Sequence, residues 1–350
     1  MLYVGSYTDG ANGQAGIHVY GVGTSTGSLR LAAEARGVVN PSYLAARGGF
    51  LYAVSEMGSG ARISAYAANQ EELRFVNSTD TEGSAMCHIS AWPRAPWLTM
   101  ANYNSGSVVT CAILEDGRVG AVTQTIQLEG RSQYPARQRG PHAHSAVPSP
   151  DGRFFFVPDL GTDRVYIYQA DIEAGLLAPN GAQRFVESEP GAGPRHIVFS
   201  PDGERAYLLT EKGCSVMAFE YNPGNGTLRH SGSARTLSHG WTEANHRTAN
   251  SASAVRVSPD GRFVYASNRG MDNIAVFATS ASNPLNPLGH YPSHGQCPRD
   301  FCLSPNGEFI AVANQTSGSL YICPRDAASG AIGEPVSEAL VPNPACVLWI

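Results

Sequence analysis

The sequence predicts an all-β protein, a seven-bladed β-propeller of four-stranded antiparallel blades that forms a single domain over residues 1–350. Only 15% of the residues are charged, and the chain holds 38 glycines and 23 prolines, a balance typical of many short strands joined by tight turns. A turn tetrapeptide recurs at a period of about 50 residues, which is typical of repeat architectures. No linker interrupts this period. Its copies are Ser149-Pro-Asp-Gly152, Ser200-Pro-Asp-Gly203, Ser258-Pro-Asp-Gly261 and Ser304-Pro-Asn-Gly307.

The repeat that begins at His196 contains the elements of one blade in order. Strands are expected at 196–199, 206–210 and 215–219, with a fourth strand from Leu228 onward. The tetrapeptide joins the first two strands: proline presets φ, aspartate caps the turn, and glycine adopts the positive φ that other residues resist. A second turn at 222–226 joins the third strand to the fourth. Four strands connected in this way form one propeller blade.

The same unit can be laid on seven segments of the chain. The segment at 2–7 matches a second strand, and the segment at 346–350 matches a first strand. We therefore expect the two ends to complete one blade together, which closes the ring and removes a free sheet edge. A closed ring leaves no obligatory interface, so the expected state is a monomer. The equivalent first-strand positions are Ser42, Cys87, His144, Arg195, Ser253, Arg299 and Ala345.

Charge and cysteine content exclude several classes of function. A net charge of -5 gives no electrostatic reason to expect nucleic acid or an anionic membrane as a partner. No stretch reaches the roughly 20 apolar residues of a membrane span, and the first residues already resemble a strand and not a leader peptide. The seven cysteines are scattered and form no CxxC pair, so neither a zinc knuckle nor a disulfide framework is indicated. A reduced, cytoplasmic location is expected.

Two series of residues should meet at one end of the central channel. The tetrapeptide turn reverses the chain at the opposite end, so first strands begin, and second strands end, at the same face. Together with the first-strand positions, the second-strand ends should surround a concave, polar site. Those ends are predicted at Tyr7, Glu56, Asn102, Asp159, Glu211, Asn268 and Asn314, with Tyr103, Lys212, Arg269 and Gln315 directly after four of them.

His144, Arg195 and Arg299 stand where the repeat predicts small or apolar residues, which indicates binding. The alternative is structural, with Arg195 and Arg299 pairing with Glu211 and Asp300 to join neighbouring blades. Serine or cysteine nucleophiles are not indicated: there is no GxSxG motif, and Cys87 has no base beside it.

Metal sites are weakly indicated, so no metal and no cofactor are expected. His142 and His144 form an HxH pair without a third histidine in the two series. The oxygen-bearing second-strand ends are of the type that calcium takes, but Arg195 and Arg269 would repel the ion.

Several segments in order resemble the seven-bladed lactonase family, whose best-known activity is 6-phosphogluconolactonase and which includes the fungal carboxy-muconate lactonizing enzyme. The resemblance covers the whole chain. The segments are Leu2-Tyr-Val-Gly-Ser-Tyr-Thr8, Asn40-Pro-Ser-Tyr-Leu44, Leu51-Tyr-Ala-Val-Ser-Glu56, Ala101-Asn-Tyr103, Pro141-His-Ala-His-Ser145, Val157-Pro-Asp-Leu-Gly161, Gly193-Pro-Arg-His196, Ala266-Ser-Asn-Arg-Gly270, Cys297-Pro-Arg-Asp-Phe301 and Val312-Ala-Asn-Gln315.

The resemblance implies a catalytic set of His144, with His142 as its alternative, and Arg195, Glu211 and Arg269. Family members often carry an acidic residue where this chain has Ser253-Ala254, a departure that would affect activity or substrate choice. Substrate contacts are expected from polar residues in or beside the two series. These are His142, Arg299, Glu56, Asn102, Tyr103, Asp159 and Asn268.

The resulting expectation is a metal-independent lactonase that hydrolyses an anionic sugar lactone. Glu211 or His144 would act as the general base, Arg195 would stabilise the oxyanion, and Arg269 and Arg299 would hold a carboxylate or phosphate. One alternative is the reverse chemistry, lactone closure on a muconate-type acid. Another is a non-catalytic propeller that binds a protein through the long connections at 129–140 and 236–250, which hold Tyr134 and Trp241.

Overall fold

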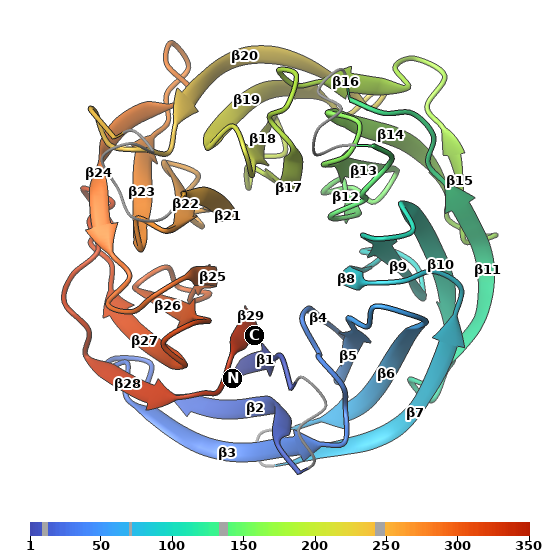
Figure 1. The fold of residues 1–350 in the computed structure, drawn as a ribbon, viewed down its shortest axis with the longest axis horizontal. Helices are drawn as coiled ribbons and strands as arrows, with labels where there is room; N and C mark the ends of the chain where they lie inside the picture. The colour runs from blue at the N-terminus through green and yellow to red at the C-terminus, as the bar shows by residue number, and fades with distance from the viewer. Residues whose placement is uncertain (9–12, 70–71, 133–138, 242–248) are drawn as a thin grey trace.

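The computed structural model describes residues 1–8, 13–69, 72–132, 139–241 and 249–350, and these form seven β-sheets arranged radially around a central axis (Figure 1). The predicted seven-bladed propeller is confirmed. Tyr134 and parts of both long connections lie outside the described residues. Among the described residues, no helix is long and apolar enough to cross a membrane.

Both chain ends lie in one blade, as predicted from the two terminal segments. The C-terminal strand is innermost and pairs with the N-terminal strand along its length (Figure 1). From the axis outward, this blade contains β29 (Pro344–Trp349), β1 (Leu2–Ser6), β2 (Ala15–Val22) and β3 (Leu29–Arg36).

The other blades follow in chain order, and each runs from its innermost to its outermost strand. The next blade contains β4 (Leu44–Arg47), β5 (Phe50–Ser55), β6 (Ala61–Ala68) and β7 (Leu73–Thr81). It is followed by β8 (Met86–Ala91), β9 (Trp97–Asn102), β10 (Ser107–Ile113) and β11 (Val119–Gln127). The fourth sheet contains β12 (Val147–Pro148), β13 (Phe154–Asp159), β14 (Arg164–Asp171), β15 (Leu176–Pro179) and β16 (Phe185–Glu187).

Three further blades complete the ring. The first contains β17 (Pro194–Phe199), β18 (Arg205–Thr210), β19 (Ser215–Asn222) and β20 (Thr227–Arg235). The second contains β21 (Ser251–Val257), β22 (Phe263–Arg269), β23 (Asn273–Ala278) and β24 (Asn286–Pro292). The third contains β25 (Pro298–Leu303), β26 (Phe309–Asn314), β27 (Ser319–Pro324) and β28 (Ser337–Leu340).

One blade departs from the four-strand pattern because its outer strand is split in two. Both β15 and β16 pair with β14, and the break between them falls after Pro179, which lacks the backbone N–H that a continuous ladder needs. Asn180, at the break, donates from its side chain to the carbonyl oxygen of Asn225 in the next blade at 2.9 Å. The Asn180 side chain therefore connects two neighbouring blades at the point where the outer strand is interrupted.

The recurrent tetrapeptide forms the hairpin between the first and second strands, as its turn chemistry predicts. In the copy between β12 and β13, the Gly152 amide donates to the Ser149 carbonyl at 2.8 Å, and the Ser149 hydroxyl donates to Asp151 at 2.6 Å. Gly152 has a φ of 69°. Because this hairpin closes one end of each blade, the starts of the first strands are held at the other end.

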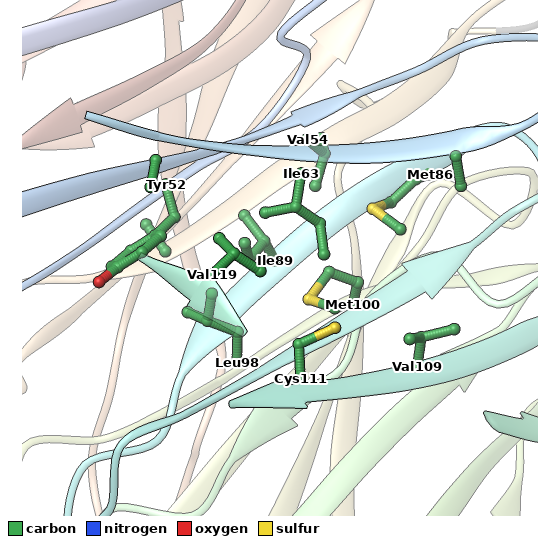
Figure 2. Close-up of a cluster of buried hydrophobic side chains, with 13 residues drawn as sticks. Tyr52, Val54, Ile63, Met86, Ile89, Leu98, Met100, Val109, Cys111 and Val119 are labelled. Atoms are coloured by element: carbon green, nitrogen blue, oxygen red, sulfur yellow. The ribbon is translucent and has the colours of Figure 1, made fainter. Parts of the chain in front are cut away.

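The hydrophobic core lies between neighbouring blades and not on the axis. Figure 2 shows the cluster between the β4–β7 and β8–β11 sheets, where Tyr52, Ile63, Met86 and Met100 interlock. Equivalent buried clusters occur at the other blade interfaces of the described structure. Packing between sheets therefore fixes the blades and leaves the ends of the inner strands to carry polar groups.

A buried ion pair ties the inner strands next to the point of ring closure. Arg256 on β21 contacts Asp300 on β25 at 2.6 Å, and the other Asp300 oxygen accepts from the Val347 amide on β29 at 3.0 Å. Both side chains are largely buried. Asp300 thus pairs with Arg256 and not with Arg299, the partner considered in the structural alternative above.

Replacing Asp300 with leucine is expected to lower the free energy of unfolding by about 3–5 kcal/mol, because Arg256 is then left as an unpaired buried charge. Urea unfolding followed by tryptophan fluorescence measures the loss. The double variant Arg256→Met/Asp300→Leu removes both charges and should recover most of the stability. Equal losses in the single and double variants would show that the pair is not the source of the effect.

Candidate active site

The starts of the inner strands carry a repeated distortion that turns one residue out of the ladder. The strand pairing skips one residue in each of four blades, at Cys87, Arg195, Arg299 and Ala345, and skips Ser253 with Ala254 in a fifth. Such β-bulges redirect side chains and are frequent beside active sites. These are first-strand positions that the repeat places at the channel end.

In five blades, the residue two positions before the first-strand position has a left-handed backbone conformation. Its carbonyl oxygen accepts a hydrogen bond from the amide of a residue in or directly after the second series. Gly193, with a φ of 67°, precedes Arg195, and its carbonyl oxygen accepts from the Glu211 amide at 2.7 Å. The equivalent carbonyls of Asn40 and Ala85 accept from Glu56 and Tyr103 at 3.0 and 2.8 Å. The other two left-handed residues are Cys297 and Asn343.

This pairing corrects the second series by one residue in several blades. Because alternate residues of a strand face opposite sides, a one-residue error exchanges inward and outward side chains. The strand partners show that Asn102, Asp159 and Asn268 are equivalent to Thr210, not to Glu211. The residues that share the Glu211 position are Tyr7, Glu56, Tyr103, Leu160, Arg269 and Gln315.

Asn102, Asp159 and Asn268 were predicted to bind substrate, but the structure places all three in the blade interior, fully buried. The Asp159 carboxylate accepts from the backbone amides of His142 and Gly161 at 2.6 and 2.8 Å. Asn102 and Asn268 likewise bond to backbone carbonyls and neighbouring side chains. These residues hold turns in place, and none of them faces the channel end.

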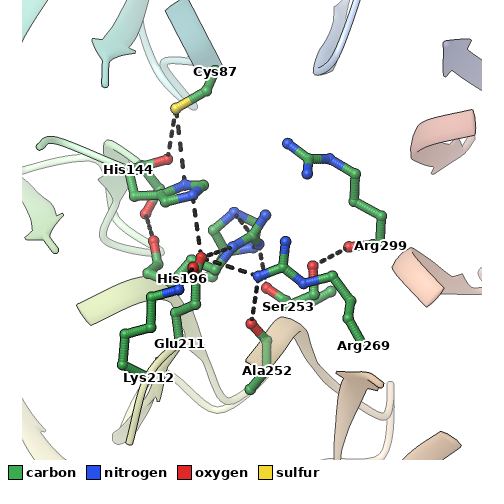
Figure 3. Close-up of polar contacts among 12 residues, drawn as sticks. Cys87, His144, His196, Glu211, Lys212, Ala252, Ser253, Arg269 and Arg299 are labelled. Carbon is green, nitrogen blue, oxygen red and sulfur yellow. Dashed lines mark hydrogen bonds and ion pairs between the residues drawn. The ribbon is translucent and has the colours of Figure 1, made fainter. Parts of the chain in front are cut away.

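Glu211 lies at the centre of the polar cluster shown in Figure 3. Its Oε2 atom contacts Arg195 Nε at 3.2 Å and Arg269 Nη2 at 3.1 Å. Its Oε1 atom contacts Lys212 Nζ at 3.0 Å. The side chains differ in depth: that of Arg195 is 4% exposed, that of Glu211 11% and that of Lys212 39%. The carboxylate therefore has two deep arginine partners and one lysine partner at the rim.

The charges around Glu211 decide its protonation state. Burial alone would raise the pKa of this carboxyl group, but the charges of Arg269 and Arg195, with a smaller contribution from Lys212, hold the pKa well below its ordinary value. Burial, together with the nearby Arg269, lowers the pKa of Arg195 to about 10. Both groups are consequently charged at neutral pH.

His144 is a buried neutral imidazole beside this cluster. Its Nε2 atom lies 3.8 Å from Glu211 Oε2, and its Nδ1 atom lies 3.8 Å from the Cys87 sulfur. Burial and the charge of Arg195 lower the pKa of His144 well below its usual value. Burial raises the pKa of the Cys87 thiol, so Cys87 is a protonated neighbour and not a thiolate nucleophile.

His142, the alternative to His144, has its tautomer fixed by a backbone contact. Its Nδ1 atom lies 2.8 Å from the Tyr103 carbonyl oxygen, which can only accept, so Nδ1 carries a proton. The imidazole stacks on the Tyr103 ring at 4.7 Å between centroids. The His142 side chain is half-buried, with Tyr103 beside it and His144 at 5.3 Å from the Tyr103 ring.

A second, smaller charged group lies across the channel end. Arg299 donates to the Tyr7 hydroxyl at 2.5 Å, and Tyr7 in turn donates to Glu56 at 2.6 Å. Arg299 also lies 3.9 Å from Glu56. Burial raises the pKa of Tyr7, which keeps its hydroxyl protonated and able to donate. Ser253, at the position where the family often has an acid, donates to the Arg299 carbonyl at 2.5 Å and so supports this group.

The structure thus brings together His144, Arg195, Glu211 and Arg269, and places His142 and Tyr103 next to them. Arg299 and Glu56 form the second group. Tyr7 and Lys212 had no predicted role, although both stand in or directly after the second series. Within the described residues, no group of three or more His, Cys, Asp or Glu side chains is arranged to hold a metal ion.

Comparison with known proteins gives consistent matches over the full chain. A family model described as "Lactonase, 7-bladed beta-propeller" matches residues 1–349. The chain is 33% identical to a 6-phosphogluconolactonase of Bacillus subtilis, with 99% of this chain and 97% of that protein covered. It is 30% identical to a 6-phosphogluconolactonase of Formosa agariphila, over 97% of this chain and 96% of that protein.

Solved structures give the same result. The periplasmic gluconolactonase of Pseudomonas aeruginosa superposes with a TM-score of 0.90 at 32% identity, covering 99% of this chain and 98% of that chain. A protein from Lactobacillus plantarum superposes with a TM-score of 0.89 at 30% identity, again covering 99% of this chain and 98% of that chain.

Proposed function

Because the chain belongs to the seven-bladed β-propeller lactonase family, we propose that it hydrolyses an anionic sugar lactone of the 6-phosphogluconolactone type without a metal ion. The observation that carries this proposal is the excess of positive charge around one ionised carboxylate. Among the described residues, Arg195, Arg269 and Lys212 contact Glu211, and Glu56 is the carboxylate that lies near Arg299. In the described part of the chain, four cations thus face two carboxylates, which suits a substrate with negative charge of its own.

The arginines also offer donors that the protein leaves unused. Nε of Arg269 is buried and has no hydrogen-bond partner within the described structure. A buried donor without a partner costs free energy unless a ligand satisfies it. We assign Arg269 and Arg299 to the anionic and hydroxyl groups of the substrate, and Arg195, the deepest of the three, to the oxyanion.

The reaction needs a base, an oxyanion donor and a proton for the leaving oxygen. In the proposed sequence a water molecule adds to the lactone carbonyl carbon and its proton passes to Glu211. Arg195 stabilises the resulting oxyanion. The bond between the carbonyl carbon and the ring oxygen then breaks, and the ring oxygen takes the proton from Glu211 to become a hydroxyl group. Negative charge from the substrate offsets the arginines and raises the basicity of Glu211.

An acid-release assay with 6-phosphogluconolactone, gluconolactone and muconolactone as substrates tests the function, with and without EDTA. Opening of a sugar lactone at the same rate in both conditions is the expected result. Loss of activity with EDTA would contradict a metal-free reaction. Activity on muconolactone alone would favour the lactonizing chemistry, and no activity on any lactone would favour the non-catalytic binding protein.

The cellular location remains a prediction. All seven cysteines are free, and burial raises the pKa of each of the six buried thiols, to about 12 for Cys111 and Cys323. These thiols match a reduced compartment such as the cytoplasm. One solved neighbour is named as a periplasmic protein, so fractionation of cells that express the full-length gene is the deciding measurement.

A further inference from the structure

Lys212 is the one lysine of the chain, and every other fixed cation is an arginine. It directly follows Glu211, and its ammonium group contacts Glu211 Oε1 at 3.0 Å. Its backbone is held in place because its amide donates to the Ala192 carbonyl at 2.9 Å. The side chain is nevertheless 39% exposed, so only the aliphatic stem and the ammonium group are free to move.

The two Glu211 oxygens are covered in different ways. Oε2 accepts from Arg195 and Arg269, which are 4% and 16% exposed and are fixed by further contacts with the Ser253 and Ala252 carbonyls. Oε1 is paired with Lys212 at the rim. A lysine is a strongly hydrated point charge on a flexible stem, so it gives up a partner more easily than a buried guanidinium. If water is to lose a proton to Glu211, Oε1 is the oxygen that can become free.

A phosphate group is the ligand that would displace Lys212 most effectively. A phosphate monoester carries a charge of about -1.5 to -2 near neutral pH and has three acceptor oxygens. Counted over the residues that the structure describes, the channel end has two more cations than carboxylates, which matches such a group better than a neutral sugar.

We propose that Lys212 determines specificity for phosphorylated lactones: the substrate phosphate draws the ammonium group away from Glu211 Oε1, and this frees Oε1 to take the proton of the attacking water. Phosphate binding and exposure of the base are then one event. This inference rests on the proposed lactonase function and names the substrate class of that site, a phosphate monoester of a sugar lactone.

The kinetic test compares 6-phosphogluconolactone with gluconolactone as substrates of the wild type and of Lys212→Met. The ratio of the two kcat/KM values should fall about 10- to 100-fold in the variant, because a charge-assisted contact to phosphate is lost. Lys212→Arg retains the charge and should recover part of the ratio. Arg229→Gln removes an exposed cation of strand β20 and is the matched control, with the wild-type ratio expected.

An unchanged ratio in Lys212→Met, with equal losses on both lactones, would overturn the role in specificity while the lactonase function stands. If the wild type opens neither lactone, the proposed function itself fails. A binding measurement separates these outcomes and does not depend on turnover.

The binding measurement uses the single lysine as its own reporter. Reductive methylation with ¹³C-formaldehyde labels Lys212 and the terminal amine, and the Lys212→Arg variant identifies the lysine signal. We expect 6-phosphogluconate to shift the Lys212 methyl resonance and gluconate, at the same concentration, to leave it in place. Equal shifts with both acids, or none with either, would contradict a phosphate contact at Lys212.

Discussion

Replacing Glu211 with glutamine is expected to lower kcat/KM for the hydrolysed lactone by about 10³-fold, the middle of the range for loss of a general base. Glutamine preserves the size of the side chain but cannot accept a proton, and it removes the charge that Arg195 and Arg269 share. Initial rates of acid release at saturating and limiting substrate separate kcat from KM. We expect most of the loss in kcat, because proton transfer occurs only in the transition state.

The control for this variant is Glu220→Gln, which removes an exposed carboxylate that pairs with Arg229 on the outer face of a blade. It should leave the rate unchanged. Because Glu211→Gln also leaves two arginines without their partner, its thermal unfolding is measured alongside the rates. Turnover within a few-fold of the wild type would remove Glu211 from the base role and pass that role to a histidine, which His144→Asn and His142→Asn would then identify.

Lowering the pH from 7 to 5 is expected to reduce the free energy of unfolding by about 6 kcal/mol through three buried histidines. Burial lowers the pKa of His88 to about 3, and it lowers the pKa values of His144 and His196 well below 6.5. His144 and His196 lie 5.5 Å apart, and His88 lies 5.9 Å from His196, measured between ring centroids.

The direction of this effect follows from proton uptake. In the unfolded chain each histidine binds a proton as the pH falls through 6.5, whereas in the folded protein the three rings stay neutral. The unfolded state therefore binds more protons than the folded state. The stability that each neutral ring contributes above pH 6.5 is lost as the pH falls, and for His88 the loss continues down to its folded-state pKa of about 3. Each proton contributes about 1.4 kcal/mol per pH unit, so the limiting slope for three is about 4 kcal/mol per pH unit.

Urea unfolding at intervals between pH 7 and 5 measures this slope. His88 Nδ1 accepts a hydrogen bond from the Ala146 amide at 3.3 Å, and an asparagine side chain also offers an acceptor. The variant His88→Asn should therefore reduce the slope by about one third. His230→Gln changes an exposed histidine and is the control, with the wild-type slope expected. A flat profile, or an unchanged slope in His88→Asn, would contradict the neutral buried state.

The repeat made the fold predictable from the sequence, because the same turn chemistry occurs at a regular interval. Each Ser-Pro-Asp-Gly copy specifies its own hairpin locally, and the two terminal segments match complementary strands. The same regularity predicted that His144, Arg195 and Glu211 lie at one end of the channel. What the period could not supply was the bulge on several first strands, which turns Arg195 and Arg299 out of the ladder.

Asn102, Asp159 and Asn268 were predicted one residue too early in the second series. Counted from the turn glycine, Asp159 and Asn268 lie seven residues on and Glu211 lies eight. A one-residue difference of this kind exchanges the two faces of a strand. Tyr103 and Arg269, each one residue later, occupy the position equivalent to Glu211. The predicted positions of His144, Arg195 and Glu211 were not affected by this one-residue offset.

By itself, the sequence determined the number of blades, their turns, the joint blade of the two termini and the residue types gathered at one face, because these depend on local patterns that recur. Only the tertiary structure decided which polar groups meet: Asp300 with Arg256, Arg299 with Tyr7 and Glu56, and Lys212 with the Oε1 atom of Glu211. Such pairings depend on bulges and on differences in burial between strands that lie far apart in the chain. A difference of one residue or a few ångströms in that arrangement sets both the pKa of Glu211 and the access to it.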